Sequence, residues 1–254
     1  MNNNDALSQL VALSRSLGEP ANDYVILGEG NTSARADETS FWVKASGTEL
    51  RTIGAEGFVR VAFDRLQAML DGPDLGDEET RQALQAAKVD PNAMGHPSVE
   101  TVLHALCLQL PGIHFVGHTH PTAINMITCS QALETAVNGR LFPDEIVVCG
   151  PAAVVVPYTD PGLPLAREVQ RRIADYIETH DEIPKTILMQ NHGFIALGAS
   201  PRQVENITAM AVKAARILVG AYALGGPRFM TPQAVARIHT RPDEHYRQRA
   251  LGQR

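Results

Sequence analysis

The most informative segment of this chain is Ile113-His114-Phe115-Val116-Gly117-His118-Thr119-His120-Pro121. Its β-branched and aromatic residues predict a strand, and the proline ends this strand or opens a helix. Side chains two residues apart on a strand point to the same face, so His118 and His120 can bind one metal ion at about 2.0–2.1 Å from each nitrogen. The alternative is that both imidazoles lie on a solvated strand face. His114 is better explained as strand packing.

The composition is that of an ordinary globular protein. The chain has 254 residues, of which 44% are hydrophobic and 20% charged, so it can bury a full core. No internal repeat or linker stands out, and we expect a single domain over residues 1–254. The formal net charge of −6 does not favour nucleic-acid binding. Six arginines between Arg228 and Arg254 are a local exception, which we interpret as a solvated or subunit-contacting face.

Cysteine usage and hydropathy indicate the compartment. The three cysteines lie in apolar contexts without CxxC spacing, so we expect buried, reduced thiols. No basic, apolar leader is visible at the N-terminus, and no apolar run approaches the roughly 20 residues of a transmembrane helix. We therefore expect a cytoplasmic protein with no membrane partner.

Hydrophobic periodicity predicts a mixture of helices and strands. Helices are expected over residues 5–17, 64–70, 121–128, 163–180 and 201–224, followed by two short helices, the last around 243–248. Strands are expected over residues 24–27, 41–44, 59–63, 146–148 and 153–156, and over two parts of 186–198 that are joined at Asn191-His192-Gly193. Residues 77–88 predict either a polar helix or a mobile lid.

Two loops rich in small polar residues lie near the N-terminus. Residues 28–35, Gly-Glu-Gly-Asn-Thr-Ser-Ala-Arg, lack the third glycine and the following helix of a dinucleotide fingerprint, so we reject a Rossmann fold. Their glycines let backbone N–H groups face an anion, with Asn31 and Ser33 as further donors; a plain hairpin turn is the alternative. Residues 44–48, Lys-Ala-Ser-Gly-Thr, form a second such turn, and the pair suggests a phosphate cradle.

The segment around Glu100 opens a predicted helix. Ser98 can cap this helix, and an acid in the first turn is favoured by the helix dipole whatever the protein does. Residues His96, Glu100 and His104, spaced by four, are an alternative metal set on one helix face, which Pro97 disfavours.

His192 completes a stronger set of metal ligands. Gly193 directly after it permits a tight hairpin and leaves the imidazole unshielded. His118, His120 and His192 supply three neutral nitrogens, enough for a catalytic zinc that keeps one position open for substrate.

Five motifs, in this order, resemble the class II aldolase/adducin superfamily of sugar-phosphate aldolases, epimerases, dehydratases and decarboxylases. They are Gly30-Asn31-Thr32-Ser33, Ala45-Ser46-Gly47-Thr48, Pro97-Ser98-Val99-Glu100, His118-Thr119-His120-Pro121 and Gln190-Asn191-His192-Gly193. The chain resembles fuculose-phosphate and rhamnulose-phosphate aldolases over nearly its whole length, and residues 42–48 look most like the aldolase part of bifunctional rhamnulose-phosphate aldolase/dehydrogenases. The resemblance implies an α/β fold, a three-layer α/β/α sandwich around a mostly antiparallel sheet. It also implies a homotetramer with active sites between subunits.

The resemblance further implies roles for individual residues. The zinc ligands are expected to be His118, His120 and His192, with another divalent metal possible. The catalytic acid/base is expected to be Glu100. The groups that hold the substrate phosphate are expected to be Asn31, Ser46, Gly47 and Ser98. The family's acid tyrosine has no match in residues 142–150. Tyr246, donated by a neighbouring subunit, is our substitute for it.

The implied function is zinc-dependent aldol cleavage of a ketose phosphate or related sugar. The products would be dihydroxyacetone phosphate and an aldehyde, formed through a zinc-stabilised enediolate with Glu100 moving the protons. Val99 stands where several aldolases have a second phosphate-binding serine, so the sequence does not decide whether the substrate carries a phosphate. Glu100 in place of the epimerases' aspartate favours cleavage. Epimerase, dehydratase or decarboxylase activity on the same site is the alternative, and so is an adducin-like scaffold, against which the three histidines argue.

Overall fold

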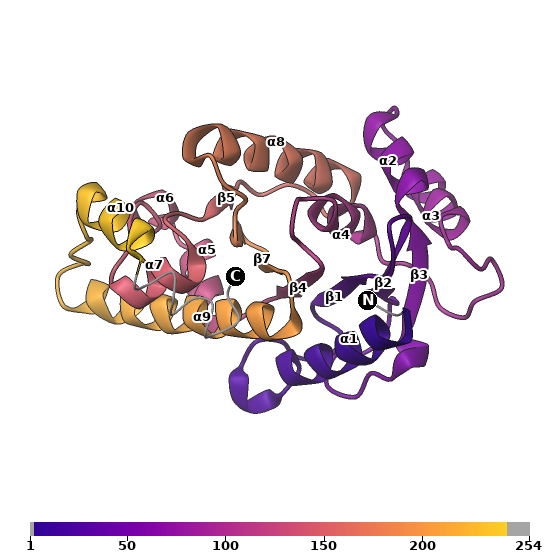
Figure 1. Cartoon of the computed structure of the whole chain (residues 1–254), viewed down its shortest axis with the longest axis horizontal. Helices are drawn as coiled ribbons and strands as arrows, with labels where there is room; N and C mark the ends of the chain where they lie inside the picture. The colour runs from indigo at the N-terminus through magenta and orange to yellow at the C-terminus, as the bar shows by residue number, and fades with distance from the viewer. Residues whose placement is uncertain (1–2, 243–254) are drawn as a thin grey trace.

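A seven-stranded sheet runs through the middle of the computed structural model, which describes residues 3–242 (Figure 1). Its strands lie in the order β3-β2-β1-β4-β7-β6-β5, and every neighbouring pair is antiparallel except β5 and β6. The strands are β1 (Asn31–Arg35), β2 (Ser40–Lys44), β3 (Phe58–Ala62), β4 (Phe115–Thr119), β5 (Val154–Val156), β6 (Thr186–Met189) and β7 (Gly193–Gly198). The histidine-bearing strand β4 is therefore the central one.

Helices cover both faces of this sheet (Figure 1). One face carries α2 (Phe63–Asp71), α3 (Asp77–Ala86), α4 (Thr101–Leu108) and α8 (Leu163–His180). The other face carries α1 (Asn3–Leu17), α5 (Thr122–Thr128), α6 (Leu133–Ala136), α7 (Pro143–Cys149) and α9 (Pro201–Ala223), and α10 (Pro232–Thr240) packs on α7. Two short 3-10 helices, η1 (Pro20–Asn22) and η2 (Ala55–Gly57), lie in the N-terminal third.

Two hydrophobic cores hold these layers together. Leu66, Leu103 and Val169 from the helices of the first face pack against the sheet in one core. Leu10 and Ile207 belong to the other core on the opposite face. Burying a side chain of this size contributes roughly 1.5–3 kcal/mol, so both faces of the sheet are stabilised mainly by apolar packing. The predicted three-layer α/β/α sandwich around a mostly antiparallel sheet is confirmed.

Several elements lie where the periodicity predicted them. The helix over 163–180 has the predicted bounds, and the two strands of 186–198 pair as an antiparallel hairpin. Residues 77–86 form a helix, which decides between the two alternatives for that segment. Glu100 lies at the N-cap of α4 and not in its first turn, and the Ser98 side chain does not cap this helix. His114 is exposed and precedes β4, so its packing role was wrong.

Two predicted strands are wrong. Residues 24–27 form a loop because Leu27 has a positive φ of 51°, and the strand begins only at Asn31. Residues 146–148 are part of the helix α7, which has a proline at its first position and acids in its first turn. The buried side chain of Arg140 donates to the carbonyls of Cys149 and Gly150 at the end of this helix. These local caps outweigh the β-branched side chains on which the strand prediction rested.

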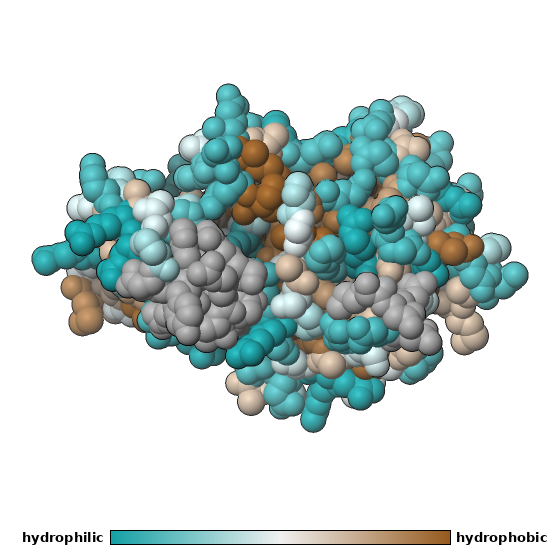
Figure 2. Space-filling model, viewed as in Figure 1, coloured by the Kyte–Doolittle hydropathy of each residue, from teal (hydrophilic) through white to brown (hydrophobic). Residues whose placement is uncertain are grey.

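The surface shown in Figure 2 is largely hydrophilic, with a hydrophobic area beside α8. Among the described residues, no helix combines the length and the apolar character that crossing a membrane requires.

Candidate metal centre

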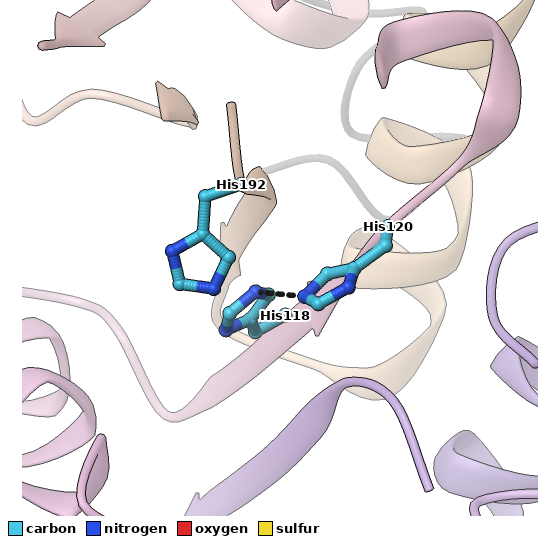
Figure 3. Close-up of side chains that lie close together, drawn as sticks. All are labelled: His118, His120 and His192. Carbon is cyan, nitrogen blue, oxygen red and sulfur yellow. Dashed lines mark hydrogen bonds between the residues drawn. The ribbon is translucent and has the colours of Figure 1, made fainter. Parts of the chain in front are cut away.

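Three histidines meet where the end of β4 lies beside the turn between β6 and β7 (Figure 3). His118 lies in β4, His120 follows that strand directly, and His192 lies in the turn before β7. The Nε2 atoms of His118 and His120 are 2.9 Å apart, and one nitrogen from each of the three rings lies within 4.8 Å of the others. Two nitrogens bound to one ion at about 2.0–2.1 Å lie roughly 3 Å apart, so the distance between His118 and His120 fits a shared metal.

The turn that carries His192 depends on its neighbours. Asn191 has a φ of 53°, a conformation that asparagine tolerates better than most residues, and its N–H donates to the Thr128 carbonyl. The Asn125 amide donates to the His192 carbonyl over 3.2 Å. A Cβ on Gly193 would lie 2.6 Å from Cδ2 of His120, so only glycine lets the turn approach this closely. The tight Asn-His-Gly turn therefore brings the third imidazole to the other two.

The charge state of His120 suits metal binding. Burial, together with the charges of His118 and His192, lowers the pKa of His120 to about 3, so this ring is neutral near pH 7 and can act as a nitrogen ligand. The contact between the two Nε2 atoms requires one ring to donate and the other to accept. A divalent metal fits this donor set, because it would replace that shared proton with bonds to both nitrogens.

Glu100 faces the same cluster from the N-terminus of α4. Its Oε1 is 3.1 Å from Nε2 of His192, and its Oε2 is 3.4 Å from Nδ1 of His118. The Asn31 side-chain N–H donates to Oε2 over 2.5 Å. Burial acts to raise the pKa of Glu100, but His118 and His192 outweigh it and hold the pKa well below its usual range. The site therefore contains an ionised carboxylate beside the three imidazoles.

The predicted phosphate-binding residues lie in two adjoining segments. Ala45 pairs with Pro97 in an isolated β-bridge, and the Ser46 N–H donates to the His96 carbonyl, so Ser46 and Gly47 lie beside the segment that carries Ser98. The hydroxyl of Ser98 is buried and has no hydrogen-bond partner among the described residues. Asn31, by contrast, directs its amide nitrogen to Glu100. Tyr246 lies outside the described residues.

The alternative metal set on the α4 face does not converge. Nδ1 of His96 lies 3.1 Å from Oε1 of Gln85, whereas Nδ1 of His104 lies 2.7 Å from Oγ of Ser33. Burial lowers the pKa of His104 to about 3, so it is a neutral side chain of the interior. Among the described residues only the set with His192 groups its nitrogens for a metal.

Two residues near the centre were quoted in the sequence motifs without a role. Oε1 of Glu29 lies 3.9 Å from Nδ1 of His120, and Glu29 also lines a pocket of about 290 Å³ beside that histidine. The side chain of Lys44 is buried and donates to the Gly28 carbonyl over 3.0 Å. Burial lowers its pKa, while the charge of Glu100 acts to raise it. The only sequence signal for a role of Glu29 or Lys44 was the presence of a charged residue in or next to a glycine-containing motif.

Comparison with known proteins identifies the family. Residues 8–219 match the model described as "Class II Aldolase and Adducin N-terminal domain". The "Uncharacterized oxidoreductase YuxG" of Bacillus subtilis is 34% identical over 179 residues, which are 67% of this chain but only 23% of that protein. The chain thus spans about a quarter of the length of that relative. The "3-oxo-tetronate 4-phosphate decarboxylase" of Haemophilus influenzae is 26% identical over 192 residues, 75% of each protein.

Solved structures agree with this match. The N-terminal class II aldolase domain of a conserved protein from Thermoplasma acidophilum has 28% identity and a TM-score of 0.65, covering 84% of this chain and 93% of that one. An L-fuculose 1-phosphate aldolase with 18% identity has a TM-score of 0.68, covers 92% of this chain and 94% of its own, and shows the likeness of the fold alone. As the five motifs predicted, the chain belongs to the class II aldolase and adducin N-terminal domain family.

Proposed function

We propose that this chain is a divalent-metal enzyme, with zinc as the metal, that cleaves a ketose phosphate or related sugar into dihydroxyacetone phosphate and an aldehyde. The observation that carries the proposal is the meeting of three histidines with the ionised carboxylate of Glu100, 3.1 Å from Nε2 of His192. When held by His118, His120 and His192, the metal would supply a Lewis acid that polarises the substrate carbonyl.

Glu100 moves the protons in this scheme. In retro-aldol cleavage the C4 hydroxyl loses its proton, the electrons of the C3–C4 bond pass towards the carbonyl, and C3 takes up a proton. The carboxylate of Glu100 is ionised and buried, and Asn31 fixes the orientation of Oε2. Oε1 faces the histidines and is the oxygen that exchanges protons with the substrate.

The substrate phosphate lies against the loop that carries Ser46 and Gly47 and against the adjoining segment that carries Ser98. Ser46, Gly47 and the unpartnered hydroxyl of Ser98 hold it, because the β-bridge between Ala45 and Pro97 keeps these segments together. Asn31 contributes mainly through Glu100, to which its amide donates. We assign the role of the second acid/base to Tyr246 from a neighbouring subunit. We further propose a homotetramer with sites between subunits, which light scattering coupled to size-exclusion chromatography tests directly.

Decarboxylation is the second candidate function. The Haemophilus influenzae relative, which matches three quarters of this chain, carries the name of a decarboxylase acting on a 3-oxo sugar-acid phosphate. Loss of CO₂ and aldol cleavage both break a carbon–carbon bond and leave its electrons next to a carbonyl, so one metal site can support either. The two differ in the product that leaves.

A substrate panel separates these activities. The zinc-loaded protein is incubated with ketose phosphates, free ketoses and 3-oxo sugar-acid phosphates, and dihydroxyacetone phosphate and CO₂ are detected by coupled assays. We expect dihydroxyacetone phosphate from at least one ketose phosphate, and a loss of at least about 100-fold in kcat for Glu100→Gln. CO₂ release alone favours the decarboxylase. Turnover of a panel member without carbon–carbon cleavage contradicts both and favours an epimerase or dehydratase.

Metal analysis tests the site independently of the reaction. We expect about one zinc ion per chain in the purified protein and its loss in His192→Ala. Full metal occupancy in His192→Ala, or a protein that takes up no divalent metal, contradicts the assignment of the three ligands.

A further inference from the structure

The loop of residues 24–30 wraps around two of the metal-ligand candidates. The His120 N–H donates to the Tyr24 carbonyl over 2.9 Å at the start of this loop. At its end, Gly30 has a φ of 72°, and a Cβ there would lie 2.7 Å from the carbonyl oxygen of His118. The loop backbone is therefore fixed against the end of β4 on both sides of Glu29.

Glu29 closes a turn within this loop. Its N–H donates to the Ile26 carbonyl over 3.1 Å, and the Ile26 N–H donates to its Oε2 over 3.0 Å. This reciprocal pair spans Leu27, whose φ of 51° is unusual for a non-glycine residue. One carboxylate oxygen of Glu29 is thus held by the turn, and the other, Oε1, is directed to His120 at 3.9 Å.

The outer nitrogens of the two histidines on β4 each face a carboxylate. Their Nε2 atoms face one another on the inner side, while Nδ1 of His118 lies 3.4 Å from Glu100 and Nδ1 of His120 lies 3.9 Å from Glu29. Histidines that bind a metal through one nitrogen generally donate the other N–H to a carboxylate or carbonyl, which fixes the ring and strengthens it as a ligand. The Glu29 side chain is 38% exposed, so it has room to close to a hydrogen bond of about 2.8 Å.

We propose that Glu29 is a positioning residue for the metal: it accepts the Nδ1–H of His120 and so fixes the Nε2 of that ring on the ion. This inference rests on the proposed metal site formed by His118, His120 and His192. It assigns Glu29 a function beyond the turn that it closes with Ile26. It also makes the loop of residues 24–30 part of the metal centre.

The affinity for Zn²⁺ and Co²⁺, measured by competition with a chromophoric chelator, tests this role without any assay of activity. We expect Glu29→Gln to bind both metals about 10-fold more weakly and Glu29→Ala up to about 100-fold more weakly. Glutamine keeps an acceptor for the Ile26 N–H but removes the charge, so it separates the effect on the metal from closure of the turn. The thermal midpoint of the metal-free protein should change little in Glu29→Gln. Glu38→Gln, at an exposed acid between β1 and β2, is the matched control and should bind like the unaltered protein.

Two results overturn the inference. Wild-type metal affinity in Glu29→Gln and Glu29→Ala removes the role altogether, while a loss in Glu29→Ala that Glu29→Gln fully restores assigns Glu29 to the turn alone. His192→Ala, measured in the same titration, distinguishes these results from a failure of the proposed site. If His192→Ala loses metal and the Glu29 variants do not, only the role of Glu29 fails. If His192→Ala also binds normally, the metal site itself fails.

Discussion

Gly193 lacks a side chain at the point where the β6–β7 turn touches the metal-ligand candidates. In Gly193→Ala, the new Cβ would lie 2.6 Å from Cδ2 of His120 and 2.7 Å from the Thr119 carbonyl oxygen, so the turn must move away. We expect the free energy of unfolding to fall by about 1–3 kcal/mol, because overpacking displaces the backbone. We also expect weaker zinc binding, since His192 moves with the turn. Urea unfolding and chelator competition measure the two effects.

Gly220→Ala is the control for this substitution. Gly220 lies on the exposed side of α9, and among the described residues no atom beyond the adjoining helix backbone lies within 4 Å of the position of its Cβ. Alanine there should stabilise the protein by about 0.5–1 kcal/mol and leave metal binding unchanged. Unaltered zinc affinity in Gly193→Ala would show that the turn does not position His192.

His118 and His120 were predictable as a pair at the level of single residues because their geometry is local, whereas the approach of His192 depends on the pairing of β4 with β7. Two histidines at strand spacing must share a face, and a glycine after His192 indicated a tight turn. Glu29 was not predictable, because its approach to His120 depends on a loop whose backbone passes through a positive φ at Leu27. Sequence patterns contain no record of such a contact between segments about 90 residues apart.

A buried ion pair between Arg140 and Glu145 stabilises the structure around α7. Arg140 and Glu145 have side chains that are 10% and 8% exposed and lie 3.1 Å apart. In Glu145→Gln the guanidinium stays buried without its counter-charge, and we expect a loss of about 3 kcal/mol in the free energy of unfolding. Chemical denaturation followed by circular dichroism measures it.

Glu168→Gln on α8 is the control for the buried pair. Glu168 also pairs with arginines, but the side chain of Arg171 is 54% exposed, and the expected loss is below about 1 kcal/mol. Equal losses in the two variants would show that burial of the Arg140–Glu145 pair does not matter.

The same helix shows where prediction of elements from sequence stops. Residues 146–148 are β-branched and predicted a strand, yet the proline and acids at the start of α7 and Arg140 at its end favour a helix. The amphipathic periodicity of 163–180 fixed the bounds of α8 because 18 residues average out such local effects. Three-residue patterns cannot do so.

The link between α10 and α8 should depend on pH. Nε2 of His239 lies 2.9 Å from Oε2 of Glu182, just after α8. Burial acts to raise the pKa of Glu182, but His239 and Tyr176 outweigh it and lower the pKa below its ordinary value. A lowered pKa in the folded state stabilises the protein above the unfolded pKa of about 4.3, and this contribution is lost as the pH falls through the folded pKa.

Unfolding free energies of Glu182→Gln and the unaltered protein, measured from pH 7 to pH 3, test this dependence. We expect the variant to be less stable at pH 7 and the difference to shrink below about pH 4. Glu178→Gln, at an exposed position of α8, should show no such pH-dependent difference. A constant difference down to pH 3 would contradict the role of the Glu182 charge.

At the scale of the whole molecule, the metal would link the central strand of the sheet to the β6–β7 hairpin on one side of it. β4 is the central strand, β1 to β3 lie on one side of it, and β5 to β7 lie on the other. His118 and His120 come from the end of β4, whereas His192 comes from the turn that joins β6 and β7. The sequence analysis predicted the layers but not the order of the strands, since periodicity alone does not determine which strands pair. The pairing of β4 with β7 places the two histidine segments together.

Metal removal should therefore lower the stability of the entire fold. A ligand that binds only the folded state stabilises it by about 2.7 kcal/mol at a free concentration 100 times its dissociation constant. We expect the thermal midpoint of the protein to fall when EDTA removes the metal and to recover with added zinc, because the ion links β4 to the β6–β7 hairpin. Because the fold unfolds as a unit, we expect both halves of the sheet to lose stability. Amide hydrogen exchange of β1 and β6 follows each half. The thermal midpoint of His118→Ala should be the same with and without zinc. A zinc-dependent shift that persists in His118→Ala would place the stabilising ion elsewhere.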